Sequence, residues 1–213
     1  MDEVDWLTCA DPPAALRFVR DRMTDRKLRL FAVACCRRVP GVAAVADDQA
    51  ALAVVMRFAD EEACPAELTA AAGRAVCPSV AEAAGPQAGA AAALASATAR
   101  ADRATAAGDP THPKGMGDFI AAELGEGRAQ CQLLRDLCGN PFRPVMIDPS
   151  WRTADVLGLA GGIYADGAFD RLPILADALQ DAGCNGGPLL DHCRGPGPHV
   201  RGCWVVDLVL GKE

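Results

Sequence analysis

Apolar residues recur at spacings of three and four along most of the chain, and this spacing places side chains on one face of an α-helix. The pattern predicts N-terminal helices over residues 11–23, 24–39 and 44–63. No segment alternates convincingly between apolar and polar positions, and residues 204–211 are the best competitor for a strand. We therefore expect an all-α fold, a multi-helix bundle.

The C-terminal half continues the helical pattern in shorter segments. It predicts helices over residues 118–139, 153–167, 169–183 and 199–211. The second and third of these are joined by a tight turn and form an αα-hairpin. The last one is apolar nearly all round, which is typical of a buried terminal helix.

Between these halves lie an alanine-rich segment and a short linker. Residues 63–108 hold 21 alanines among 46 residues, and alanine has the highest helix propensity, so helices are expected on both sides of Gly85-Pro86. Residues 109–117 are rich in glycine and proline, as in a loop. We expect an N-terminal bundle over residues 1–108, a linker over 109–117 and a C-terminal helical half over 118–213.

Charge and cysteine content narrow the classes of function. The formal net charge is −7, which argues against nucleic acid as a partner because phosphate binding needs basic surface. The acidic start resembles no export signal, and no apolar run is long enough to span a membrane, so we expect a cytoplasmic protein without a membrane partner. In reducing cytosol the ten cysteines are expected to be free thiols or metal ligands.

One local stretch is basic. Residues 17–38 hold eight basic residues against Asp21 and Asp25. Either this is a solvated helical face or it binds an acidic partner protein. The candidate interaction residues are Arg17, Arg20, Lys27, Arg37 and Arg38.

The C-terminal segment concentrates residues that bind metals. Its candidate ligands are Cys184, His192, Cys193, His199 and Cys203. Zinc favours sulfur and imidazole nitrogen, but no C-x-x-C pair is present and Pro198 suggests that His199 opens the last helix. A structural zinc site is therefore one hypothesis for this segment, with no other cofactor indicated.

Two other interpretations of the same segment remain open. In the first it closes the fold, with Trp204 buried and Asp207 paired to Arg194, Arg201 or His199, because a carboxylate among apolar neighbours needs a partner. In the second, Cys193 or Cys203 is a nucleophile activated by a histidine that Asp207 orients. No known hydrolase, phosphate-loop or dinucleotide motif accompanies that arrangement.

Four stretches carry a resemblance to a known group of proteins. They are "DRKLRLFAVACCRR", "LRDLCGNPFRPVMIDPSW", "FDRLPILADALQDAGC" and "HCRGPGPHVRGCWVVDLVLGKE". With them the chain resembles a paralogous group of uncharacterised planctomycete proteins, some of which are near or fused to repeat-companion domains. The resemblance implies a recurrent interaction module and carries over no activity, cofactor or catalytic residue.

These observations favour a cytosolic helical adaptor or scaffold that binds another protein without catalysis. The absence of catalytic motifs, the helical hairpin and the basic stretch support this hypothesis. The first alternative is a zinc-stabilised module, and the second is a cysteine-dependent enzyme.

Overall fold

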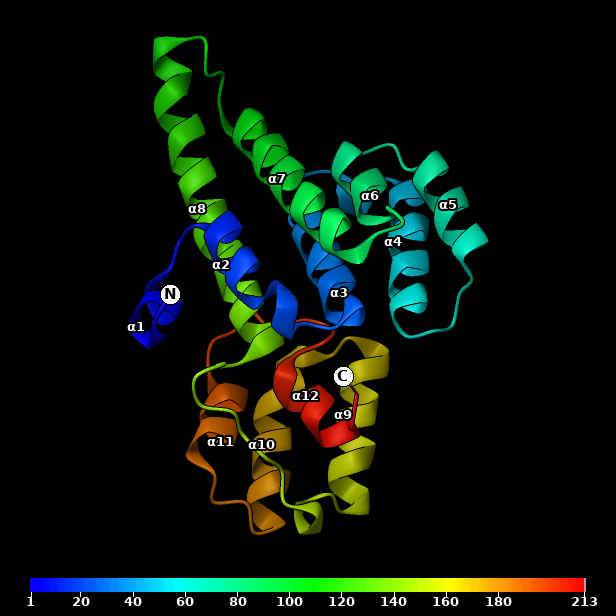
Figure 1. Ribbon diagram of the computed structural model, residues 1–213, viewed down its shortest axis with the longest axis vertical. Helices are drawn as coiled ribbons and strands as arrows, with labels where there is room; N and C mark the ends of the chain where they lie inside the picture. Colours follow the sequence, from blue (N-terminus) through cyan, green and yellow to red (C-terminus); the bar gives the residue numbers. More distant parts are fainter. Residues whose placement is uncertain (213) are drawn as a thin grey trace. The chain divides into compact units, whose positions relative to one another are not determined.

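The computed structural model describes residues 1–212, apart from the side chains of residues 113 and 114. Every regular element in that part of the chain is a helix, which confirms the all-α prediction (Figure 1). The first eight α-helices are α1 (Glu3–Thr8), α2 (Pro12–Val19), α3 (Asp25–Cys36), α4 (Ala46–Ala59), α5 (Pro65–Arg74), α6 (Pro78–Ala83), α7 (Ala88–Ala107) and α8 (Pro113–Cys138). They are followed by α9 (Ala154–Asp166), α10 (Leu172–Asp181), α11 (Gly187–Arg194) and α12 (Trp204–Leu210).

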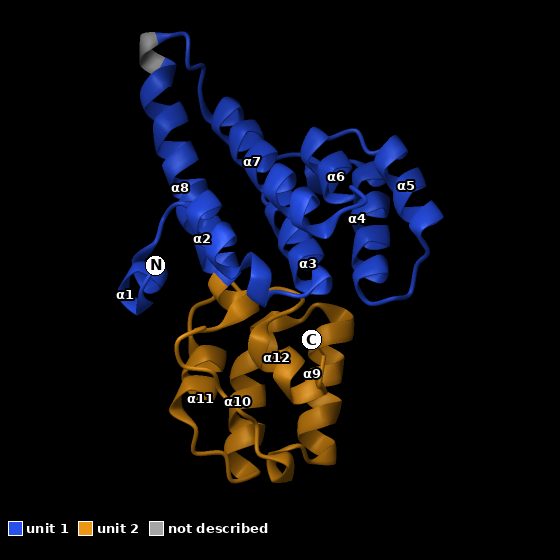
Figure 2. Ribbon diagram, in the orientation of Figure 1, with its two compact units in different colours: residues 1–134 blue, residues 135–213 orange. Residues whose placement is uncertain are grey.

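The chain forms two compact units, residues 1–134 and 135–213 (Figure 2). This division differs from the expected linker over residues 109–117, because α8 already begins at Pro113. Proline fits the first turn of a helix, where its missing N–H needs no partner, so a proline-rich stretch does not have to be a loop. The last turn of α8 belongs to the second unit.

In unit 1 the core is built around α3. Nine of its residues are buried, among them Phe31 at 0% exposure. The alanine-rich segment folds as α5, α6 and α7, and Gly85-Pro86 lies between α6 and α7 as expected. In α7 the buried positions are mostly alanines, whose short side chains let other backbones approach closely.

Unit 2 holds α9 to α12 and a core of leucine, valine, alanine and cysteine. The hairpin of α9 and α10 was predicted correctly, and α9 ends at Gly167 in the left-handed conformation with φ of +66°. The last helix is shorter than predicted, since it begins at Trp204 and not at His199. Gly202 has φ of +93°, which interrupts helical geometry just before α12.

Candidate metal centre

Four side chains that can bind a metal converge in unit 2. They are Asp136, His192, His199 and Cys203, and one possible ligand atom from each lies within 4.8 Å of all the others. The group joins an acid from the end of α8 to residues that follow it by more than fifty positions. Such a set offers one oxygen, two nitrogens and one sulfur to a shared point.

Asp136 owes its place to the way α8 ends. Gly139 follows α8 with φ of +65°, in the left-handed region where glycine is free of strain. A Cβ atom at this position would lie 3.2 Å from the Trp204 ring, so the chain passes close under that indole. The same ring lies 5.1 Å from the His192 imidazole, measured between centroids, and helps to fix its orientation.

The other three residues come from α11 and the connection that follows it. His192 is in the last turn of α11, which ends at Arg194. The glycines and prolines of residues 195–198 then lead the chain in a non-helical path to His199. A turn closed by the hydrogen bond from Cys203 N to the Val200 carbonyl, 2.8 Å long, brings the thiol back toward the histidines.

Short distances connect these atoms in pairs. Asp136 Oδ1 lies 3.1 Å from His192 Nε2 and 2.9 Å from His199 Nδ1. His192 Nε2 also lies 3.2 Å from Cys203 Sγ. One ring nitrogen therefore faces both a carboxylate oxygen and a sulfur, although a single N–H can donate fully to only one of them.

Backbone groups hold the outer side of this cluster. The Val200 N–H donates to Asp136 Oδ2 over 2.9 Å, which leaves Oδ1 for the two imidazoles. The other nitrogen of His199, Nε2, lies 3.3 Å from the Gly195 carbonyl oxygen. A carbonyl beside Nε2 favours a proton on that nitrogen, so a neutral His199 bound to a metal would offer the lone pair of Nδ1 to the ion.

Burial and hydrogen bonding act in opposite directions on the titrating groups. Burial raises the pKa of Asp136, but the hydrogen bonds from His192, His199 and Val200 outweigh it, and the pKa lies below its ordinary value. For His199, burial lowers the pKa, yet the contact with Asp136 outweighs it and the pKa is raised. In the metal-free protein the two residues thus favour an ion pair.

The thiol of Cys203 is protonated in the same metal-free arrangement. Burial raises its pKa well above the ordinary value, and the charge of Asp136 adds to this effect. The N–H groups of Val206 and Val205 act in the opposite direction. A nucleophilic cysteine needs a lowered pKa and access, and Cys203 is 0% exposed.

The cluster also differs from a catalytic triad in the histidine nitrogens that contact the cysteine and the acid. A triad uses both ring nitrogens of its histidine, one for the nucleophile and one for the orienting acid. Here His192 presents the single atom Nε2 to Cys203 and to Asp136. The acid is Asp136, whereas the sequence had suggested Asp207.

Three of the five candidate ligands from the sequence thus meet, and two do not. Cys184 and Cys193 are 2% and 0% exposed and belong to the apolar core of unit 2. Burial, followed by the charge of Asp136, raises the pKa of Cys193 to about 12. Sequence reasoning missed the fourth residue of the cluster, Asp136, an acid in the stretch "LLRDLCG" whose side chain is 3% exposed.

Some of the residues expected to close the fold around Asp207 contact other groups instead. Arg194 binds Asp177 at the surface, with a distance of 2.7 Å from Nη2 to Oδ1. Arg201 lies over the ring of Tyr164, with 4.2 Å from Cζ to the centroid. Asp207 is 2% exposed, as expected of a buried acid. Trp204 is half-buried rather than buried, because its ring covers Gly139 and His192 at the border of the core.

The five basic candidates of unit 1 come from several elements, namely α2, the turn that follows it, the two ends of α3 and the turn after α3. Lys27 and Arg37 stand at opposite ends of α3, in its first turn and at its C-cap. Arg17 and Arg20 are exposed and line a groove between α2 and α7.

Arg38 is half-buried, and its guanidinium group binds a buried acid of unit 1. Its Nε lies 2.9 Å from Oε1 of Glu126, whose side chain is 0% exposed. Arg103 binds the other oxygen of Glu126 over 3.0 Å and donates to the Arg38 carbonyl over 2.7 Å. These contacts satisfy a buried carboxylate and connect the turn after α3 to α7 and α8.

No helix in the described part of the chain is both long and apolar enough to cross a bilayer. Comparisons with protein-family models, with curated proteins and with solved structures found no match for this chain.

Proposed function

We propose that unit 2 is a zinc-stabilised helical module in which Asp136, His192, His199 and Cys203 bind one Zn²⁺ ion. The observation that carries the proposal is the approach of four ligand atoms to within 4.8 Å of one another. The ion joins the end of α8, the end of α11 and the residue that precedes α12. Its role is to hold these three segments together.

The kind of ligand favours zinc. Imidazole nitrogen, thiolate sulfur and carboxylate oxygen are all zinc ligands, whereas magnesium and calcium prefer oxygen alone. Zinc bonds of 2.0 to 2.3 Å in a tetrahedron separate the ligand atoms by about 3.3 to 3.7 Å. To reach these separations the contacts of 2.9 to 3.2 Å around Asp136 and His192 lengthen by a few tenths of an ångström, and the widest pairs, within 4.8 Å, shorten by about 1 Å.

The charges also balance. An ionised Asp136, an ionised Cys203 and two neutral histidines carry a charge of −2, which one Zn²⁺ neutralises. Such a neutral complex suits side chains that are 3% and 0% exposed, since burial of an uncompensated charge is costly. Binding the ion releases the thiol proton and reverses the pKa shift that burial imposes on Cys203.

The site is structural rather than catalytic. Four protein ligands complete the tetrahedral shell, and a catalytic zinc keeps one position for water or substrate. The side chains of His192 and His199 are 20% and 11% exposed, so the ion reaches the site from the side of the imidazoles. The buried sulfur and carboxylate lie behind them.

Elemental analysis of the purified full-length protein tests the proposal. We expect about one zinc per chain, and we expect a chelator to lower the thermal midpoint by several degrees, because metal binding to the folded state adds directly to stability. Zinc, but not magnesium, should restore the midpoint. A protein without stoichiometric metal whose midpoint does not respond to added zinc contradicts the proposal.

The adaptor role expected from the sequence is a second proposal. It is supported by one observation, the groove between α2 and α7 in unit 1, where Arg17 and Arg20 flank an apolar surface. It does not depend on the zinc ion, and a partner-binding experiment tests it separately.

A further inference from the structure

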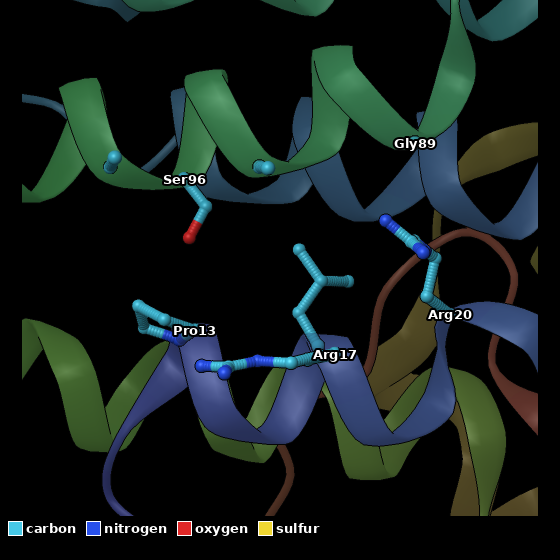
Figure 3. A pocket seen from close by; sticks show the side chains of 8 residues that line it. Pro13, Arg17, Arg20, Gly89 and Ser96 are labelled. Atoms are coloured by element: carbon cyan, nitrogen blue, oxygen red, sulfur yellow. The ribbon is translucent and has the colours of Figure 1, made fainter.

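Unit 1 carries a groove between α2 and α7, in which side chains of the two helices face one another across an open space (Figure 3). The groove encloses about 310 Å³. Pro13 and Ser96 lie toward one end of it, and Arg20 and Gly89 toward the other (Figure 3). Both helices belong to the same compact unit.

Small residues on α7 create this space. Gly89, Ala93 and Ala97 follow one another at intervals of four, so they share one face of the helix. None of them has a side chain longer than a methyl group, and Ala93 and Ala97 are exposed. Leu16 on α2 is 5% exposed and supplies the apolar surface opposite.

The polar atom within the groove already has its partner. Ser96 is 4% exposed, and its hydroxyl donates to Gln130 Oε1 over 2.7 Å. The Gln130 side chain in turn donates to the Ser96 carbonyl over 3.1 Å. The inner surface is therefore suited to an apolar group, because a ligand need not satisfy any buried donor there.

The edge of the groove is positively charged. Arg17 is exposed and has no hydrogen-bond or ion-pair partner for its side chain within residues 1–212. Arg20 pairs with Asp21 over 3.6 Å, but both side chains are exposed, by 58% and 88%. A surface pair of this kind is weak and exchanges readily for a better carboxylate partner.

We infer that this groove binds a segment of another protein that presents a leucine-sized aliphatic side chain beside one or more carboxylates. The aliphatic group enters between Leu16 and the small residues of α7, and the carboxylates bind the guanidinium groups of Arg17 and Arg20. Guanidinium binds carboxylate through two parallel hydrogen bonds, which gives the pairing both strength and orientation.

The dimensions agree with a peptide occupant. The groove extends from Pro13 to Arg20, a rise of about 10 Å along the helix, or roughly two turns. That length matches one or two anchor residues of an amphipathic helix bound in a groove. The volume lies at the low end of small-molecule pockets, so it accommodates side chains rather than a large cofactor.

Nuclear magnetic resonance of the ¹⁵N-labelled full-length protein provides the test. The probe is the peptide acetyl-Glu-Leu-Leu-Glu-amide, added up to about 10 mM so that even millimolar binding is measured. We expect saturable shifts of the amide signals of Gly89, Ala93 and Ala97. The peptide acetyl-Lys-Leu-Leu-Lys-amide, with the charges reversed, should cause at least about tenfold weaker binding.

Two variants with matched controls locate the binding. Arg17→Glu reverses a charge at the groove, and Arg74→Glu makes the same change at an exposed residue of α5. Ala93→Phe fills the groove, and Leu94→Phe adds an aromatic ring at the next residue of α7, which is 50% exposed. The first member of each pair should weaken peptide binding at least about tenfold, and the second should not.

The spectrum of each variant also reports whether it is folded, so a loss of binding is separable from a loss of structure. Absence of shifts at the three α7 residues, or equal binding of both peptides, overturns the proposal. Sodium octanoate is added in a parallel titration. If octanoate saturates the groove and the peptide does not, the occupant is a small amphiphile and the inference of a protein segment is wrong. Zinc content plays no part in these outcomes.

Discussion

His192 Nε2 and Asp136 Oδ1 lie 3.1 Å apart although 56 positions separate the two residues in the sequence. The contact joins the last turn of α11 to the last turn of α8. Cys203 Sγ lies 3.2 Å from the same His192 nitrogen. One proton on that nitrogen cannot form full hydrogen bonds to both the carboxylate oxygen and the sulfur, whereas a metal cation can bind the nitrogen, the oxygen and the sulfur at once.

Replacing the histidines should remove zinc and stability together. His192→Ala and His199→Ala each take away one ligand, and we expect at least a ~100-fold loss of zinc affinity with a lower thermal midpoint in both. Arg194→Ala is the control, since Arg194 shares the last turn of α11 with His192 but binds Asp177 at the surface. Calorimetric zinc titration and thermal melts provide the measurement. Histidine variants that keep full zinc affinity would show that the ligands were wrongly assigned.

Cobalt distinguishes the cysteine that binds the metal from its neighbour. Co²⁺ replaces zinc in tetrahedral sites, and a thiolate ligand gives the complex a sulfur-to-metal absorption band. We expect Cys203→Ser to abolish that band and Cys193→Ser to retain it, because Cys193 is equally buried but lies outside the cluster. Retention of the band in Cys203→Ser would mean that another thiol is the ligand.

The helical class followed from the sequence because apolar spacing records which face of each helix is buried. The boundaries were less predictable where glycine and proline lie inside helices, as in the first turn of α8, or where a turn replaces a helical start, as at His199. Local composition does not reveal whether a proline occupies the one helical turn that tolerates it.

The part of the candidate site whose residues are close together in the sequence was predictable. His192, His199 and Cys203 lie within twelve residues, so their clustering is visible in the sequence. Asp136 was not, since only the tertiary fold brings it there. The available signal was an acid with leucines close on both sides, at Leu134 and Leu137, because a carboxylate rarely enters a largely apolar helix without a partner.

The pH dependence of stability should differ between metal-free and zinc-bound protein. The pKa of Asp136 is lowered from 3.8, so its contribution is present above that pH and is lost as the pH falls through the lowered value. The pKa of His199 is raised from 6.5, so its contribution is complete below that pH and is lost as the pH rises through the raised value. In metal-free protein the pair therefore stabilises most between these limits.

Bound zinc reverses the loss of stability on the alkaline side, because the ion binds only deprotonated ligands and therefore binds more tightly as the pH rises. The difference in thermal midpoint between zinc-bound and metal-free protein should grow as the pH rises from about 5.5 to about 8. Thermal melts with zinc and with chelator at each pH give that difference. Groups distant from the site titrate in the same way in both samples, so their contributions cancel. A difference that stays constant over the range would argue against histidine ligands.

The last prediction concerns the glycine beneath Trp204. Gly139 and Gly167 both follow a helix with nearly the same φ, +65° and +66°. An added Cβ meets open space at Gly167, but at Gly139 it would lie 3.2 Å from the indole. Gly167→Ala should therefore lower the free energy of unfolding by about 1 to 2 kcal/mol, the cost of left-handed geometry for alanine.

Gly139→Ala should cost that amount and about 1 kcal/mol or more besides, since the Trp204 ring must move to admit the methyl group. The ring contacts the His192 imidazole, with 5.1 Å between centroids, so its displacement also disturbs a zinc ligand. We expect zinc affinity to fall in Gly139→Ala and to remain unchanged in Gly167→Ala. Denaturant melts of the zinc-free variants measure the first effect, and zinc titrations measure the second. Equal zinc affinities in the two variants would mean that Trp204 does not orient His192.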